Sequence, residues 1–187
     1  MLSENNSKII LSRVRLGDHA AFKELYNNYA ESMLDYSMSI TCDRQYAKDV
    51  VQEIFVIIWR NKEKLKPEMN IKMYLFKAVR NNSIKLLQSN KTKGSLNKEV
   101  ESIPYDTIPL DNLQEKELHD AYKEALLSLP RKCKEIFMLN RYSRFTYAEI
   151  ADVQEISINT VKTQMKRALR TLKSKLSHFL DPEIFTL

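Results

Sequence analysis

The sequence predicts an all-α protein. Only two glycines and five prolines occur among 187 residues, which leaves little material for β-turns. Leu, Lys, Glu, Ala and Met, which favour helices or tolerate them well, are plentiful. Apolar residues recur at steps of three and four, the period of an amphipathic helix. Because 43% of the residues are hydrophobic, the chain can bury a core, and its length allows two small helical domains.

The N-terminal part contains four expected helices. The first covers residues 7–15 and ends before Gly17. Asp18 is a good N-cap for the second, whose core stripe consists of Phe22, Leu25, Tyr26, Tyr29, Met33 and Tyr36. The third covers residues 43–61 and buries Ala47, Val50, Val51, Ile54, Phe55 and Ile58. The fourth covers residues 70–88 and buries Ile71, Leu75, Ala78 and Leu86.

A flexible linker is expected next, because residues 89–109 lose the helical period and collect Asn, Ser, Gly and two prolines. The predicted domains are therefore 1–90 and 111–187, with the linker at 91–110. Helicity resumes near residue 111, with one side formed by Leu118, Ala121, Tyr122, Ala125 and Leu126. Pro130 ends that helix, and another covers residues 131–142.

The C-terminal part predicts a helix-turn-helix. Thr146 and Glu149 have the spacing of a capping box, which opens a short helix over residues 147–153. Ser157 suits the N-cap of a longer helix over residues 158–178. Its expected buried stripe is Val161, Met165, Leu169, Leu172 and Leu176. Ala151 is small enough to let the two helices cross closely, as this motif requires.

Charge favours a polyanionic partner. Residues 69–98 carry seven Lys or Arg and no acid, and residues 157–180 carry six and no acid. Residues 99–120, in contrast, hold seven acids and one base. The outward face of the last helix predicts a reader of the DNA major groove, made of Asn159, Thr160, Lys162, Thr163, Lys166, Arg167 and Arg170. The alternative is a basic surface helix without a ligand.

The turn of this motif departs from the common Leu-Gly, because it reads Gln154-Glu155. A glycine there would relieve strain at positive φ. Either Glu155 accepts that strain, or the turn has a different geometry.

Several function classes find no support. Cys42 and Cys133 are far apart and are expected to be reduced, partly buried thiols. Three isolated histidines suggest no metal site, and no cofactor motif is present. The polar N-terminus does not look like a signal peptide, and the longest apolar run, 54–59, is too short to span a bilayer. We expect a cytoplasmic protein without catalytic activity.

Five motifs follow one another along the chain. The first three are residues 17–26 (GDHAAFKELY), 49–59 (DVVQEIFVIIW) and 74–81 (YLFKAVRN). The last two are residues 129–137 (LP and EIF), and 147–151 (YAEIA) through 160–162 (TVK) to 167–169 (RAL). In this order they resemble regions 2 and 4, respectively, of one family, the extracytoplasmic-function (ECF) sigma factors of bacterial RNA polymerase. Residues 70–76 look most like members found in Bacteroidetes.

The resemblance implies three interfaces. Asp49, Gln52 and Glu53 match the helix that binds the clamp of the largest polymerase subunit. The match also implies binding to the minus-ten promoter element, where Asn81 lines a pocket for a flipped base. Basic and aromatic side chains next to it suit a single DNA strand. The residues implied in this site are Tyr74, Phe76, Lys77, Arg80, Asn81 and Lys85. Phe76 alternatively belongs to the core. Lys162, Thr163, Lys166 and Arg167 match readers of the minus-thirty-five element.

The implied partners are core RNA polymerase, including the flap of its second-largest subunit, promoter DNA, and an anti-sigma factor that is often membrane-anchored. Two positions depart from the family, since Lys48 and Lys85 stand where acids are frequent. One rival is a stand-alone helix-turn-helix regulator, which leaves the motifs at 49–59 and 74–81 unexplained. A helical enzyme or RNA-binding protein with a reactive cysteine is the other.

Overall fold

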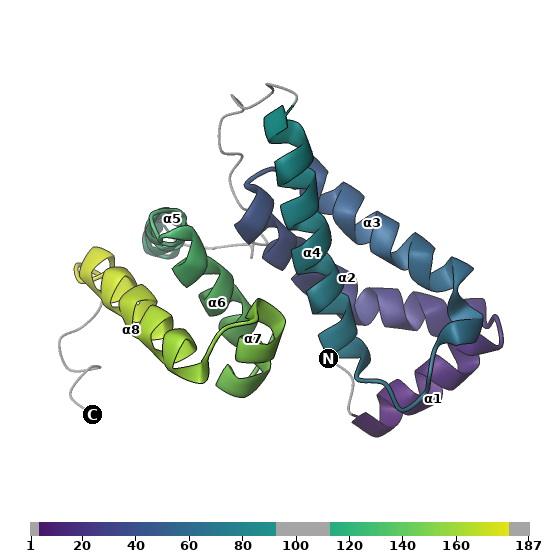
Figure 1. The fold of residues 1–187 in the computed structure, drawn as a ribbon. Coiled ribbons are helices and arrows are strands. Elements are labelled where there is room, and N and C mark those ends of the chain that lie inside the picture. Colours follow the sequence, from purple (N-terminus) through teal and green to yellow (C-terminus); the bar gives the residue numbers. More distant parts are fainter. Residues whose placement is uncertain (1–3, 93–112, 180–187) are drawn as a thin grey trace. The chain divides into compact units, whose positions relative to one another are not determined.

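The structure, a computed structural model, describes residues 4–92 and 113–179. All regular elements within these residues are helices (Figure 1), which confirms the predicted all-α class. Contacts divide the chain into two units, Met1–Glu101 and Ser102–Leu187. Most of the predicted linker lies outside the described residues, so the domain limits at 90 and 111 stay a prediction.

The first unit is built around one long central helix. Its elements are α1 (Glu4–Arg15), α2 (His19–Thr41), α3 (Arg44–Arg60), the 3-10 helix η1 (Lys62–Lys64) and α4 (Ile71–Thr92). α2 packs against α1, α3 and α4. Leu25, Tyr29, Met33 and Tyr36 of α2 are buried as predicted. Two ends differ from expectation by three residues or more, because α1 starts three residues before Ser7 and α4 continues four residues beyond Gln88.

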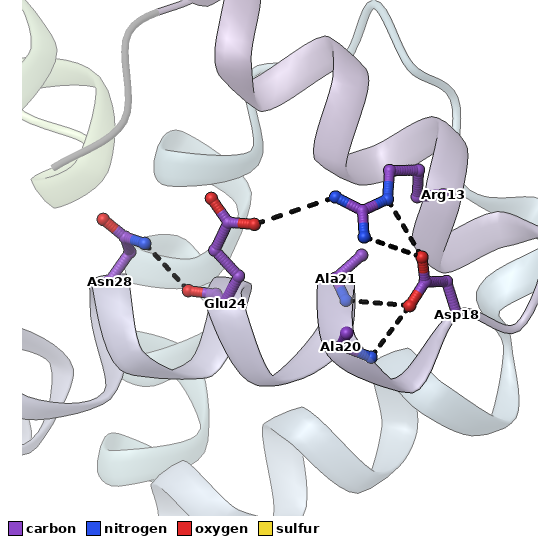
Figure 2. A network of polar contacts seen from close by, with 6 residues as sticks. All are labelled: Arg13, Asp18, Ala20, Ala21, Glu24 and Asn28. Carbon is purple, nitrogen blue, oxygen red and sulfur yellow. Dashed lines mark hydrogen bonds and ion pairs between the residues drawn. The ribbon is translucent and has the colours of Figure 1, made fainter.

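The connection from α1 to α2 is held by one carboxylate, shown in Figure 2. Asp18 Oδ1 accepts hydrogen bonds from the backbone amides of Ala20 (2.8 Å) and Ala21 (3.1 Å), which makes Asp18 the predicted N-cap. Asp18 Oδ2 binds Arg13, whose Nη2 lies 2.8 Å away. Gly17 has a φ of +86°, a conformation that a residue with a side chain rarely adopts.

Part of the predicted core stripe of α2 is open to solvent. Tyr26 is 41% exposed and Phe22 is half-buried, which corrects their assignment to the core. Both rings lean on α3, where Phe55 lies 4.8 Å from Tyr26 and Trp59 lies 4.9 Å from Phe22, measured between ring centroids. They therefore form a partly exposed aromatic cluster at the edge of the α2–α3 contact.

α4 is buried over a wider arc than its predicted stripe. Ile71 and Leu75 are buried as expected, but Phe76 and Val79 are also buried, whereas Ala78 and Leu86 are only half-buried. The reason is that α4 packs against both α2 and α3. At 100° per residue, Phe76 points about 100° away from Leu75, toward a second helix.

The second unit contains α5 (Leu113–Leu127), α6 (Arg131–Arg141), α7 (Tyr147–Gln154) and α8 (Ile158–Lys175). α8 packs against α5, α6 and α7. The predicted breaks hold, since α5 ends before Pro130 and α6 begins directly after it. Leu118 of α5, placed on the apolar side, is 39% exposed. α8 ends three residues before the expected His178.

α7 and α8 form the helix-turn-helix. The capping box of α7 is present, because Thr146 Oγ1 accepts from the Glu149 amide while the Glu149 carboxylate accepts from the Thr146 amide at 2.8 Å. Val161, Met165, Leu172 and Leu176 are buried as predicted. Leu169 was wrongly assigned to this stripe. It is 51% exposed, and Ala168 is buried instead, because Leu169 lies about 80° round the helix from Val161.

Candidate nucleic-acid interface

The outward face of α8 is solvent-exposed and basic. α8 contains no acidic residue, and all seven predicted DNA-contacting side chains are exposed: Asn159, Thr160, Lys162, Thr163, Lys166, Arg167 and Arg170. The buried stripe on the opposite side explains this orientation, since it fixes the rotation of the helix about its axis. Such a face can contact phosphates and base edges in the major groove.

Two hydroxyls on this face already take part in local hydrogen bonds. The Ser157 side chain caps α8 by accepting from the Thr160 amide at 3.1 Å, and the two hydroxyl oxygens lie 2.9 Å apart. Thr163 Oγ1 donates to the backbone carbonyl of Asn159 at 2.9 Å. In this arrangement Thr163 presents its lone pairs and its methyl group, so it can accept a hydrogen bond or pack on a thymine methyl.

The turn between α7 and α8 keeps its usual geometry despite Glu155. Glu155 adopts a left-handed conformation with a φ of 54° and a ψ of 47°. Its amide and that of Ile156 both donate to the carbonyl of Ala151, the latter at 3.0 Å. These bonds satisfy the end of α7. Glu155 therefore accepts the strain, which for a residue with a Cβ is about 1–2 kcal/mol.

A second basic surface runs along α4. This helix also lacks acidic residues. Tyr74, Lys77, Asn81 and Lys85 are exposed on it and Arg80 is half-buried. Arg80 Nη1 lies 3.5 Å from Asn81 Oδ1, at the limit of a hydrogen bond, so the guanidinium lies next to the predicted base-binding amide.

Phe76 does not belong to this surface. Its side chain is 0% exposed, and its ring lies 5.7 Å from that of Tyr36 in the core. A base cannot stack on it without opening the contact between α2 and α4, so the alternative that Phe76 is a core residue is correct. Tyr74 is the exposed aromatic residue of the predicted set.

An acidic and amide-bearing surface occupies α3. Asp49, Gln52 and Glu53 are all exposed, as predicted. Asp49 Oδ1 accepts a hydrogen bond from Gln45 Nε2 at 2.9 Å, a contact that spans one helical turn. Sequence reasoning missed Gln45, although its position four residues before Asp49 is the spacing that brings two side chains together on a helix.

Sequence reasoning also missed a groove of about 580 Å³ between α2 and α3. Gln52 and Lys48 line one side, and the other is lined by Tyr26, Asn27, Ala30, Glu31 and Leu34. No sequence signal points to this groove, because Tyr26 belongs to the apolar stripe of α2 and its exposure depends on how α2 packs against α3. The groove places Lys48, noted as a departure from the family, beside the acidic surface.

The two cysteines lie in different surroundings, since Cys42 is partly buried and Cys133 is buried. No group of three or more metal-ligating side chains occurs among these residues, and none of the described helices could cross a membrane. Cys133 is buried and its Sγ donates to Gln164 Oε1 at 3.0 Å. Burial raises the pKa of the Cys133 thiol, partly offset by the charge of Arg167.

The family models match these two units. Residues 25–92 match the model "Sigma-70 region 2", and residues 119–172 match "Sigma-70, region 4". The chain belongs to the sigma-70 family. The first match spans most of α2 together with α3 and α4. The second begins within α5, spans α6 and α7, and ends near the C-terminal end of α8. The predicted order of the two regions is confirmed.

Similar proteins place it among the ECF sigma factors. SigW of Bacillus subtilis is 22% identical over 176 residues, which cover 89% of this chain and 94% of SigW. SigK of Mycobacterium tuberculosis is 23% identical over 175 residues, 89% of this chain and 91% of SigK. The chain is thus an alternative sigma factor of the ECF type, a family of transcription initiation factors.

Two solved structures share the fold. CnrH in complex with the cytosolic domain of CnrY has a TM-score of 0.64 and 19% identity, and covers 92% of this chain and 98% of that one. The sigma factor RpoE in complex with the anti-sigma factor NepR, from Bartonella quintana, has a TM-score of 0.65 and 22% identity, covering 83% and 96%.

Proposed function

We propose that this ECF sigma factor binds core RNA polymerase, recognises the two promoter elements with separate basic helices, and opens DNA without catalysis of its own. One observation carries the proposal. Each of the two regions presents an exposed, acid-free basic face on a single helix, α4 in region 2 and α8 in region 4. The cell compartment that fits this work is the cytoplasm.

The minus-thirty-five element is read by α8. Lys162, Lys166 and Arg167 can donate to guanine O6 and N7 or to phosphates, while Asn159 and Thr163 contact base edges near the start of the helix. Arg170 lies further along and suits a phosphate. Thr160 takes part in the cap of α8. We therefore assign it to positioning of the helix and to contact with the DNA phosphate backbone.

The minus-ten element is bound by α4 as a single strand. Lys77, Arg80 and Lys85 follow the phosphates, Tyr74 offers a ring for stacking, and Asn81 binds an unstacked base through its amide. Arg80 supports Asn81 from the neighbouring position. Binding of unpaired bases makes the open state more favourable, so opening needs no nucleotide hydrolysis.

The polymerase clamp binds the exposed residues of α3. Asp49, Gln52 and Glu53 offer carboxylate and amide oxygens, which suit arginine-rich partners. The neighbouring groove gives this contact an apolar part at Tyr26 and Leu34. Region 4 contacts the flap of the second-largest subunit, as the resemblance implies.

An anti-sigma factor is the further partner we propose. The similar RpoE structure holds the anti-sigma factor NepR, and the CnrH structure holds the cytosolic part of CnrY. A partner of this kind, often membrane-anchored in the family, would hold the sigma factor inactive by covering its polymerase-binding surface.

Reconstituted transcription tests the proposal. The purified chain is mixed with core polymerase and fragmented DNA of the source organism, and specific transcripts are mapped. We expect transcripts that start downstream of a shared pair of sequence elements. A chain that binds duplex DNA alone but directs no transcription by core polymerase would instead be a stand-alone regulator. The Asp49→Asn, Gln52→Ala and Glu53→Gln triple variant should lose transcripts while its thermal unfolding is unchanged.

A further inference from the structure

α6 carries a buried carboxylate that the proposed interfaces do not use. Glu135 is 2% exposed and lies on α6 beside the core residue Ile136. Its Oε1 accepts from Arg131 Nε at 2.8 Å, and its Oε2 accepts from Gln154 Nε2 at 3.1 Å. Gln154 is itself only 1% exposed. The second bond thus joins α6 to the end of α7 inside the domain.

Gln154 lies directly before the turn that connects α7 to α8. Gln154 is the last residue of α7, and Glu155 directly after it has the left-handed conformation. Ser157, three residues after Gln154, caps α8. The hydrogen bond between Gln154 and Glu135 therefore lies at the start of the turn that sets the direction of α8. It restrains Gln154, the residue directly before the strained Glu155.

A second polar contact links α6 to α8. Cys133, two residues before Glu135, donates through Sγ to Gln164 Oε1 at 3.0 Å. α6 is thus joined to each helix of the helix-turn-helix by a side-chain hydrogen bond. Apolar contacts are non-directional, so they tolerate small rotations better than hydrogen bonds do.

The energetics favour a positioning role over simple stabilisation. Burying an amide and a carboxylate has a desolvation cost, which a hydrophobic pair of similar size would avoid. Once buried, these groups strongly disfavour any arrangement that separates them, because an unpaired buried polar group is costly. The backbone strain at Glu155 lowers the free-energy difference between the observed turn and other turn conformations. The hydrogen bond between Gln154 and Glu135 raises the free energy of those other conformations, because they would break it.

We propose that Gln154 and Glu135 are positioning residues for promoter recognition, which hold the turn so that α8 meets the minus-thirty-five element in one orientation. This inference rests on the proposed function of α8. It predicts that a substitution that breaks the Gln154–Glu135 hydrogen bond lowers the ratio of affinities for promoter and non-promoter DNA. In free-energy terms, this loss should exceed the loss in free energy of unfolding.

Gln154→Glu tests the pair through pH. The variant places the carboxyl group of residue 154 within hydrogen-bond distance of the Glu135 carboxyl group. Two carboxylates this close repel each other, so ionising both is unfavourable. Lowering the pH lets the pair share a proton and restores a hydrogen bond. Arg131, Lys132 and Lys134 are the cationic residues in the first turn of α6, and they are unchanged in the variant. Glu135→Gln with Gln154→Glu exchanges the two groups and restores the donor at every pH.

The readout is the ratio of holoenzyme affinities for two duplexes, one selected from a random pool by the wild-type holoenzyme and one with a scrambled minus-thirty-five element. For Gln154→Glu we expect a ratio about tenfold below wild type at pH 8, equivalent to about 1.4 kcal/mol, with recovery toward wild type at pH 5.5. The exchange variant should match wild type at both pH values. Ala148→Glu, which adds a carboxylate at an exposed position of α7, controls for charge.

Two results would overturn the inference. One is a Gln154→Glu ratio that follows the wild-type pH profile. The other is an exchange variant that is folded by circular dichroism but does not recover the ratio. If wild-type holoenzyme selects no sequence at all, the proposed function fails instead, and the two failures are therefore distinct.

Discussion

Arg13, near the end of α1, holds the carboxylate of Asp18 through two nitrogens, with Nη2 and Nε lying 2.8 and 2.9 Å from Oδ2. Figure 2 shows the same carboxylate capping α2 with its other oxygen. The hydrogen bond from the Ala21 amide is the largest cause that lowers the pKa of Asp18 below its usual value, followed by the bond from Arg13. Because the folded state prefers the ionised form, this contact couples the stability of region 2 to pH.

Asp18→Asn should therefore destabilise region 2 in a pH-dependent manner. A lowered pKa in the folded state contributes stability that is present above the unfolded value of 3.8 and is lost as the pH falls through the folded value. The difference in free energy of unfolding between wild type and variant should be constant near pH 7 and shrink below about pH 4. Urea unfolding at several pH values measures it. Glu53→Gln, at an exposed site on α3, is the control, and a difference that does not change with pH would contradict the assignment.

Phe76→Ala and Tyr74→Ala should separate folding from DNA binding. Removing the buried Phe76 ring should cost about 3–5 kcal/mol of stability, as for other large core residues. The exposed Tyr74→Ala should change stability by less than about 1 kcal/mol but weaken binding of a single-stranded minus-ten oligonucleotide by holoenzyme. A stable Phe76→Ala variant with weak oligonucleotide binding would return Phe76 to the interface.

Lys166→Ala with Arg167→Ala should lose minus-thirty-five specificity while core binding persists. Each correct contact to a base contributes about 1–3 kcal/mol of discrimination. The matched control removes two charges from the last turn of α8, through Lys173→Ala and Lys175→Ala, and should weaken binding to all duplexes equally. Fluorescence anisotropy at two salt concentrations distinguishes the two effects. Equal loss of core binding in the first variant would indicate misfolding.

Glu155→Gly should stabilise region 4. It removes the left-handed strain of a residue with a Cβ, partly offset by the greater entropy of glycine in the unfolded chain, which leaves about 0.5–1 kcal/mol. Ala148→Gly, within α7 where φ is negative, should have the opposite sign, with a loss of about 0.5–1 kcal/mol. Differential scanning calorimetry measures both. Destabilisation by Glu155→Gly would contradict the account in which backbone strain dominates at this position.

Cys133 should be unreactive in the native protein. Burial raises the pKa of its thiol, so little thiolate forms near pH 7, whereas Cys42 is only partly buried. Alkylation by iodoacetamide followed by mass spectrometry should label Cys42 first and Cys133 only on unfolding. Equal labelling rates would contradict the buried position of Cys133.

Local signals in the sequence predicted most of the fold. Asp18, Thr146 and Ser157 were recognised as caps because capping depends on residue type and spacing alone. The burial of Phe76 and Tyr26 was less predictable. It depends on how many helices pack around α4 and α2, and the helical period of one segment does not contain that information. The order of the two regions followed from motifs, because the motifs are local.

The candidate sites were predictable only where a side chain faces solvent from a helix of known rotation. The exposed faces of α3, α4 and α8 meet this condition. The Glu135–Gln154 contact does not, because it joins residues 19 positions apart. From the sequence, Gln154 was visible only as a polar residue where an apolar one is common, with no indication of its partner.

Promoter opening measured without nucleotides tests the central claim most directly. A promoter duplex carrying 2-aminopurine in the non-template strand of its minus-ten element becomes more fluorescent when its bases unstack. Core polymerase together with the wild-type chain should raise the fluorescence in the absence of ATP, and Tyr74→Ala with Asn81→Ala should abolish the rise while still binding core. A chain that binds this duplex, with or without core polymerase, and never raises the fluorescence would contradict the account.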